Sequence, residues 1–132
     1  MPDEPSQEDL TTPREGQLWR RIPCNRQVIF DPKLGRKRPT TAAFDDWKDE
    51  LGDPDPVSAY VATKCQRPIV ALDGLPGFGL VMITKALVED CGLKIVEKEQ
   101  TGPPGHVLLV GAKTYKVRNR LATGAEWVVP CP

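Results

Sequence analysis

The sequence predicts a small α+β domain, with a mixed sheet of about five strands and two main helices. The chain has 132 residues, which fits a single domain that can bury a core without metals or cross-links. Its composition, 39% hydrophobic and 27% charged, is typical of a soluble globular protein. The 14 prolines and 11 glycines indicate many short connections between elements.

Residues 1–16 are acidic and carry almost no apolar side chains, so we expect a disordered tail before a single domain at 17–132. Residues 17–22 and 28–30 are expected to form short extended segments, because the apolar runs are broken at 23–25. Neighbouring residues on a strand point to opposite faces, so one of Arg20 and Arg21 can be drawn inward. A buried arginine needs a partner.

The middle of the chain begins with a basic turn at 33–39, followed by an acidic loop at 45–55 with a helical turn around Trp47. Apolar residues alternate at 57–62, the period expected of a strand. A short apolar run at 69–72 is expected to be either another strand or the approach to a helix.

The second half is predicted to hold both helices. Apolar residues at helical spacing, followed by Gly92, predict a helix over 78–91. A second helix is expected over 113–122, with Thr114 as its N-cap and Gly124 after its end. Strands are expected at 93–96, 107–110 and 127–129, and the continuous apolar run at 107–110 is typical of burial on both faces.

The chain is electrically neutral, but its charges lie in blocks. Residues 20–38 hold seven cations against one carboxylate, and residues 45–55 hold six carboxylates against one lysine. We expect the two blocks to neutralise each other in the fold, because a nucleic-acid footprint usually comes with a basic overall balance.

The four cysteines lie far apart, and the chain has one histidine. This spacing does not fit a zinc site, so we predict no metal, and no motif predicts a cofactor. The first residues lack the apolar core of a signal peptide, which favours a cytoplasmic location with free thiols. No apolar run is long enough to cross a bilayer.

Two features could bind anions. The glycine-rich segment at 74–79 precedes the first predicted helix, but its spacing departs from the P-loop and dinucleotide fingerprints, so a tight turn is the favoured interpretation. The basic loop is the stronger candidate, because it gathers cations and hydroxyl groups. Its predicted ligand-binding residues are Arg36, Lys37, Arg38, Thr40 and Thr41. The second helix adds further basic residues that could extend a phosphate-binding or nucleic-acid-binding face.

His106, the only histidine, begins an apolar strand after a Pro-Pro-Gly turn. A strand-end histidine beside a loop could act as a general base. The structural alternative is a ring hydrogen-bonded to a loop carbonyl.

Residues 18–23 (LWRRIP), 35–44 (GRKRPTTAAF) and 105–111 (GHVLLVG), followed by a basic helix and residues 125–128 (AEWV), resemble a group of small uncharacterised bacterial proteins. The resemblance spans nearly the whole chain from residue 17. It implies a single fold and a bacterial source, and no activity.

A second similarity is to ADP-ribosyltransferases, which use an arginine, a serine-threonine-serine segment and a glutamate to bind NAD. It implies that Arg20, Thr40, Thr41 and Glu126 would take these roles.

We therefore predict a non-catalytic bacterial binding or accessory module whose basic loop contacts an anionic protein or a phosphorylated ligand. A cluster of cations without a paired nucleophile and base favours binding over catalysis. The alternative is a small nucleotide-acting enzyme centred on His106 or on the Arg20 and Glu126 set.

Overall fold

The computed structural model describes residues 10–48, 51, 54–98 and 102–131. Most of the predicted N-terminal tail, residues 1–9, lies outside this part of the chain. Leu10 is partly buried against the core, and the first strand begins at Gln17 as expected.

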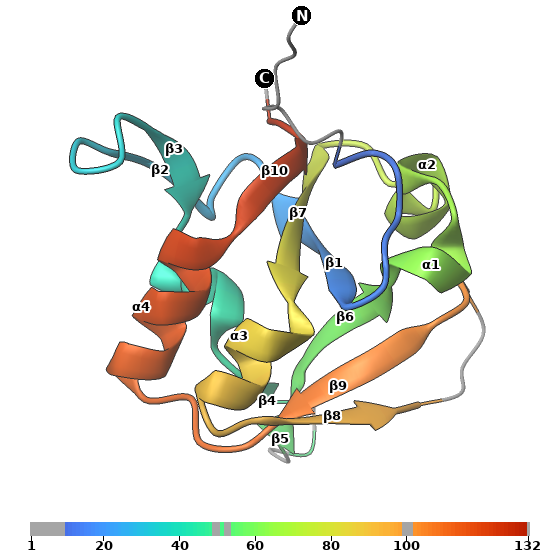
Figure 1. Cartoon of the computed structure of the whole chain (residues 1–132). Helices are drawn as coiled ribbons and strands as arrows, with labels where there is room; N and C mark the ends of the chain where they lie inside the picture. Colours follow the sequence, from blue (N-terminus) through green and yellow to red (C-terminus); the bar gives the residue numbers. More distant parts are fainter. Residues whose placement is uncertain (1–9, 49–50, 52–53, 99–101, 132) are drawn as a thin grey trace, which may run out of the picture.

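A six-stranded sheet forms the body of this small α+β domain (Figure 1). The strand order is β10-β7-β1-β6-β9-β8, and every neighbouring pair is antiparallel. The prediction of a mixed five-stranded sheet is therefore wrong in its details. Parallel neighbours need long crossover connections, and the short links of this chain favour antiparallel ones. The six strands are β1 (Gln17–Pro23), β6 (Val57–Val61), β7 (Phe78–Thr84), β8 (Lys94–Glu97), β9 (His106–Val110) and β10 (Glu126–Val129).

Two small strand pairs lie outside the main sheet. Strands β2 (Val28–Asp31) and β3 (Arg36–Pro39) form a hairpin that projects from the body, and β4 (Trp47–Lys48) pairs with β5 (Pro54–Asp55) (Figure 1). The expected basic turn is therefore mostly strand β3, because the reversal itself lies at residues 31–35. The helical turn expected around Trp47 occurs earlier, as the 3-10 helix η1 (Thr41–Phe44).

The helix predicted over 78–91 is wrong in its first half. Residues Phe78–Thr84 form the strand β7, which pairs with β1 on one side and β10 on the other, so almost every side chain is buried. A continuous apolar run fits a buried strand as well as a helix, and here the tertiary pairing decides. The helix begins only at α3 (Lys85–Asp90), where Thr84 accepts the N-cap hydrogen bond from Leu87 N.

The second predicted helix is confirmed as α4 (Tyr115–Gly124), with the Thr114 side chain accepting from Val117 N. The apolar run at 69–72 belongs to the short helix α2 (Pro68–Leu72), which follows α1 (Ala62–Cys65). Strand β9 alternates between buried and more exposed residues, so the expectation of burial on both faces is wrong.

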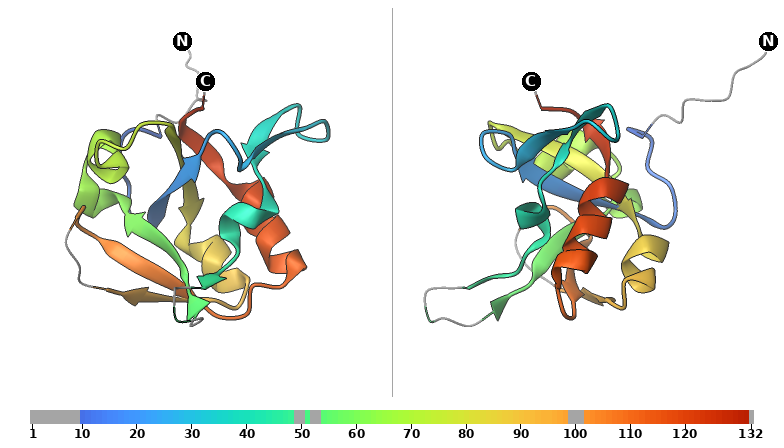
Figure 2. Two further views of the ribbon diagram at one scale, coloured as in Figure 1. Left: turned by 180° about the vertical axis from the view of Figure 1, so that it is seen from behind. Right: turned by 90° about the vertical axis from the view of Figure 1, so that its left-hand side faces the viewer.

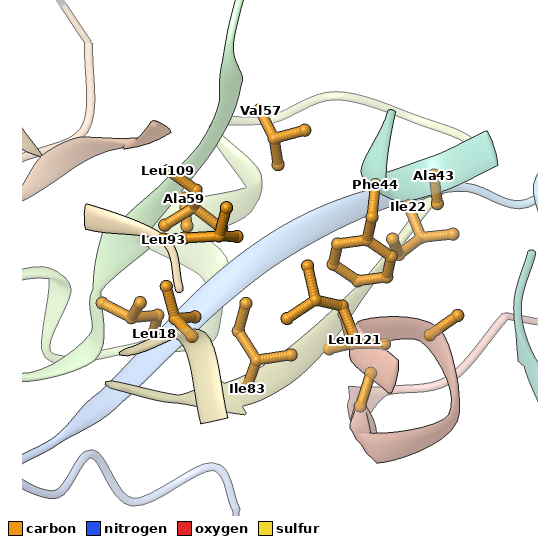
Figure 3. Packing of buried hydrophobic residues seen from close by; sticks show 14 of the residues in the cluster. Leu18, Ile22, Ala43, Phe44, Val57, Ala59, Ile83, Leu93, Leu109 and Leu121 are labelled. Carbon is orange, nitrogen blue, oxygen red and sulfur yellow. The ribbon is translucent and has the colours of Figure 1, made fainter. Parts of the chain in front are cut away.

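The sheet separates two hydrophobic clusters. The larger cluster lies on the face covered by η1, α3 and α4, with Leu18, Ile22, Phe44, Ile83 and Leu121 at its centre (Figure 3). The smaller cluster lies on the other face, where α1 and α2 pack over Trp19, Leu80 and Met82. Figures 1 and 2 show this separation of α3 and α4 from α1 and α2.

Cys24 and Cys131 form a disulfide across a sequence separation of 107 residues. The expectation of free thiols is therefore wrong for these two cysteines, while Cys65 and Cys91 are free. Burial raises the pKa of the Cys65 thiol to about 11, so this thiol is protonated at neutral pH. Among the helices of the described residues, none combines the length and the apolar character that crossing a membrane requires.

Candidate functional site

The candidate site lies where two neighbouring strands of the sheet separate. Strands β1 and β6 pair only at Leu18 with Val61 and at Trp19 with Tyr60. Beyond Trp19, β1 continues along β7 for four more residues, up to Pro23 opposite Phe78. The far end of β1 therefore borders a gap on its β6 side, and Arg20 and Arg21 lie at this gap.

Arg20 bridges the gap. Its Nε donates to the carbonyl of Ala43 at 2.9 Å, and its Nη1 donates to the carbonyl of Ser58 at 2.6 Å. The guanidinium carbon lies 5.7 Å from the centre of the Phe44 ring, a cation–π distance. The prediction that one arginine is drawn inward and finds a partner is confirmed, with backbone carbonyls as the partners.

The Arg20 charge is held in unfavourable surroundings. Burial and, to a smaller extent, the neighbouring charge of Arg21 together lower the pKa of Arg20 to about 10, while the charge of Asp46 opposes this shift. A pKa of about 10 still leaves the guanidinium protonated by about a thousand to one at pH 7. Two adjacent cations therefore remain at the gap, and an anion placed there would relieve their repulsion.

Arg21 points to the opposite face and contacts Tyr60. Its Nη2 donates to the Tyr60 hydroxyl at 2.8 Å, and its guanidinium carbon lies 5.1 Å from the ring centre. Burial raises the pKa of Tyr60, although the charge of Arg21 opposes this shift, so the hydroxyl stays protonated at neutral pH. A hydroxyl that accepts from Arg21 still has its own proton to donate to a ligand.

These groups line a pocket of about 200 Å³, which we call the arginine pocket. Three arginines contribute to it, and none of its described lining residues is an aspartate or glutamate. Arg26 is exposed at its rim, whereas Gln27 is buried. The lining residues are Arg20, Arg21, Pro23, Arg26, Gln27, Ser58, Tyr60 and Phe78. Guanidinium groups present forked donors that match carboxylate and phosphate oxygens, so this pocket suits a small anion.

The predicted basic loop does not present three free cations. Arg38 Nε donates to Asp31 Oδ2 at 2.7 Å, and Arg38 Nη1 donates to the Pro39 carbonyl. Arg36 Nη2 donates to the Ala125 carbonyl at 3.2 Å. Only Lys37 of the three is exposed. The two arginines fix the hairpin to itself and to the segment between α4 and β10.

The two predicted threonines follow the hairpin, and Thr40 lies between β3 and η1. Thr40 N donates to the Gln27 carbonyl at 3.0 Å, which brings the backbone of Thr40 close to that of a pocket residue. Its side-chain oxygen is buried and makes no hydrogen bond within the described residues. Thr41 is the first residue of η1. Neither threonine lines the arginine pocket.

Glu126 does not meet Arg20. Glu126 pairs with Met82, which pairs with Trp19, so these three residues share the face of the smaller cluster. Arg20 follows Trp19 on β1 and contacts Phe44 on the opposite face. The ADP-ribosyltransferase-like set is therefore split between the two faces of the sheet.

His106 begins β9, as expected, and pairs with Tyr60. The two ring centres are 5.2 Å apart. His106 lines a separate cavity of about 740 Å³, which we call the histidine cavity, together with Lys64, Glu97 and the residues around Gly105. Tyr60 lies between this histidine and Arg21, so the candidate base and the arginine pocket are neighbours across one side chain.

A residue of each charge block forms an ion pair in the structure. Asp46 of the acidic block forms an ion pair with Lys113 at 3.0 Å, while Asp31 holds Arg38 inside the hairpin. Arg120 of the second helix pairs with Asp90 at 2.7 Å. The charge of Asp46 also acts on Arg20 of the basic block, where it opposes the lowering of the Arg20 pKa. Asp49, Glu50 and Asp53 of the acidic block lie outside the described residues, so the expected neutralisation of the two blocks stays a prediction.

Within the described residues, no group of three or more His, Cys, Asp or Glu side chains is placed to hold a metal ion. No family model, curated protein or solved structure matches the chain. The class of this protein thus rests on its own geometry, an antiparallel α+β domain with an arginine-lined pocket.

Sequence reasoning named Arg20 as a candidate site residue and did not name Arg21, Arg26, Tyr60 or Phe78 as pocket residues. The consecutive arginines on a predicted strand were a signal, because two side chains on opposite faces can converge only at a strand edge. No local pattern identified Tyr60 or Phe78, which join the pocket through long-range pairing.

Proposed function

We propose that this protein is a non-catalytic binding module for a small anionic ligand, phosphorylated or carboxylate, held in the arginine pocket. The observation that carries the proposal is the meeting of Arg20, Arg21 and Arg26 around one small cavity without a lining carboxylate. Holding like charges side by side around a partly enclosed cavity is unfavourable, and a bound anion is the simplest compensation.

The pocket assigns different tasks to its arginines. Arg20 and Arg21 are held by protein hydrogen bonds, so their donors are already oriented before a ligand arrives. Such preorganisation reduces the entropy lost on binding. Arg26 is exposed and can close on the ligand from the rim.

The test is calorimetric titration with inorganic phosphate, sulfate and succinate at low ionic strength. We expect Arg26→Gln and Arg21→Gln to weaken binding by about tenfold or more, since hydrogen bonds to charged groups contribute about 1.5–3 kcal/mol. Lys116→Gln, which removes one exposed charge from α4, is the matched control and should leave affinity unchanged. Equal losses in all three variants would reduce the effect to net charge and reject the pocket.

A second candidate function is protein contact through the β2–β3 hairpin. Its side chains include Ile29 (49% exposed), Phe30 (58%) and Leu34 (41%), and Lys33 and Lys37 are exposed beside them. Clustered exposed apolar residues mark interaction surfaces, and the two lysines favour an acidic partner. The body of the hairpin is rigid, because Asp31 accepts from Lys33 N, Leu34 N and Arg38.

Charge reversal tests this surface. Lys37→Glu should abolish salt-sensitive capture of an acidic partner protein, and Lys116→Glu should not. Arg36 and Arg38 are unsuitable for this test, because their side chains hold the hairpin in place.

A further inference from the structure

We infer that the anionic ligand carries a planar ring, as a nucleoside monophosphate does, and that the ring lies in a second pocket next to the arginine pocket. This inference rests on the proposed function, since the anion supplies the first contact. It gives a role to the glycine-rich segment at 74–79, which does not precede a helix.

The second pocket has a volume of about 360 Å³, and two prolines, a phenylalanine and a glycine form more than half of its lining residues. It shares Pro23, Arg26 and Phe78 with the arginine pocket, so the two cavities adjoin. Its lining residues are Pro23, Cys24, Asn25, Arg26, Pro76, Gly77 and Phe78. Ligand pockets commonly measure about 300–1,000 Å³, so the adjoining cavities together are of the size that takes a small organic ligand.

The chemistry of the walls suits a flat ring. Phe78 and the two prolines offer apolar surfaces, and a guanidinium such as that of Arg26 can stack on an aromatic face. Asn25 is exposed and can donate to or accept from the edge of a base. An inorganic anion would contact Arg26 and would make no use of Phe78, the two prolines or Asn25.

The second pocket is fixed in shape before binding. Gly74 and Gly77 adopt positive φ angles of 69° and 78°, which shape the turn that carries Pro76. The Gly77 carbonyl accepts from Cys24 N at 2.9 Å, and Cys24 is itself tied to Cys131. The two walls therefore stay at a set separation, and ordering them costs little on binding.

The two pockets also divide the ligand's polarity. Three cations face one cavity, while prolines, a phenylalanine and a glycine dominate the other. Arg26 stands at the boundary and can contact both the anion and the ring. A phosphate joined to a ring by a short linker, such as a ribose, matches this order.

The experiment titrates the protein with four probes: a nucleoside 5′-monophosphate, ribose 5-phosphate, inorganic phosphate and phenyl phosphate. We expect the nucleotide to bind at least about fivefold more tightly than ribose 5-phosphate, at the lower end of base-stacking contributions. Phenyl phosphate at or above the nucleotide's affinity would keep the ring and identify a simple aryl phosphate instead of a nucleotide.

Phe78→Leu should remove most of this advantage, and because Phe78 also lines the arginine pocket, its effect is measured as the change in the ratio of nucleotide affinity to inorganic phosphate affinity. Phe30→Leu, an exposed phenylalanine on the hairpin, is the matched control. Pro76→Ala is the second variant and should leave inorganic phosphate binding unchanged, because Pro76 is exposed and lines the second pocket but not the arginine pocket.

The outcomes separate the two proposals. Binding of every phosphate with equal affinity, unaffected by Phe78→Leu and Pro76→Ala, would overturn the ring pocket and leave the anion site standing. No binding of any of these probes, nor of sulfate or succinate, would overturn both.

Discussion

The strongest stability prediction concerns the disulfide between Cys24 and Cys131. A cross-link stabilises a protein mainly by restricting the unfolded chain, and the effect grows with the enclosed loop. A separation of 107 residues gives about 5 kcal/mol in the chain-entropy model at 25 °C. This is a large share of the stability of an ordinary domain, about 5–15 kcal/mol.

The loss converts into a melting temperature. The unfolding entropy is about 2.1 cal/mol/K per residue, which gives about 0.28 kcal/mol/K for a chain of 132 residues. Cys131→Ser should therefore lower the melting temperature by about 15–20 °C. Reductant should lower that of the wild-type protein by a similar amount and leave the variant unchanged.

Thermal unfolding followed by circular dichroism, with and without reductant, measures this shift. Thiol titration of the denatured, unreduced protein should give two reactive cysteines, Cys65 and Cys91. Cys91→Ser is the control, because it removes a free thiol. Two titratable thiols together with a Cys131→Ser melting temperature within about 3 °C of wild type would refute the loop-entropy reasoning.

Three further predictions concern single side chains. The hydrogen bond from Arg38 lowers the pKa of Asp31, so the ion pair stabilises the fold above pH 3.8 and stops doing so as the pH falls through the folded-state pKa of Asp31. The difference in melting temperature between wild type and Asp31→Asn should therefore shrink from pH 6 to pH 2. A constant difference would reject the ion pair. Arg20→Met should lower the free energy of unfolding, measured with denaturant, by about 1–3 kcal/mol. Two carbonyls lose their donor in this variant, and removal of the charged group from its partly buried position offsets part of that loss. An unchanged denaturation midpoint would contradict the bridging role of Arg20. Gly79→Ala should lower the free energy of unfolding by about 1–3 kcal/mol, because the added Cβ would lie 2.8 Å from the Val129 carbonyl oxygen and 2.9 Å from Cys131 Sγ. This loss should be smaller under reductant, because the free Cys131 sulfur can then move.

Strand β6 was located correctly because its local pattern is that of a strand. The alternation of apolar residues at 57–61 has the two-residue period of a strand, and these residues form β6. Residues 78–84 carry no alternation, because β7 has a strand on each side and a hydrophobic cluster on each face. Only knowledge of its neighbours would have separated this strand from a helix.

The sequence did not predict the β2–β3 hairpin, for a different reason. Strand β3 is Arg-Lys-Arg-Pro, a composition that predicts a solvated turn. It is a strand because Ile29 and Phe30 of β2 pair with Arg38 and Lys37, so the regularity lies in the partner strand. The disulfide was likewise invisible, since cysteine spacing alone does not determine pairing.

The candidate site depends on the part of the fold that is least readable from sequence, the place where β1 and β6 stop pairing. If β1 and β6 stayed paired up to Pro23, a backbone N–H would donate to the Ser58 carbonyl, and this carbonyl would not be available to the Arg20 side chain. Separation leaves the Ser58 carbonyl in need of a donor, and Arg20 supplies one together with a charge that Asp46 balances only in part. The same step that completes the backbone hydrogen bonding thus creates the excess of positive charge, so a bound anion would improve the local electrostatics of the fold while serving as its ligand.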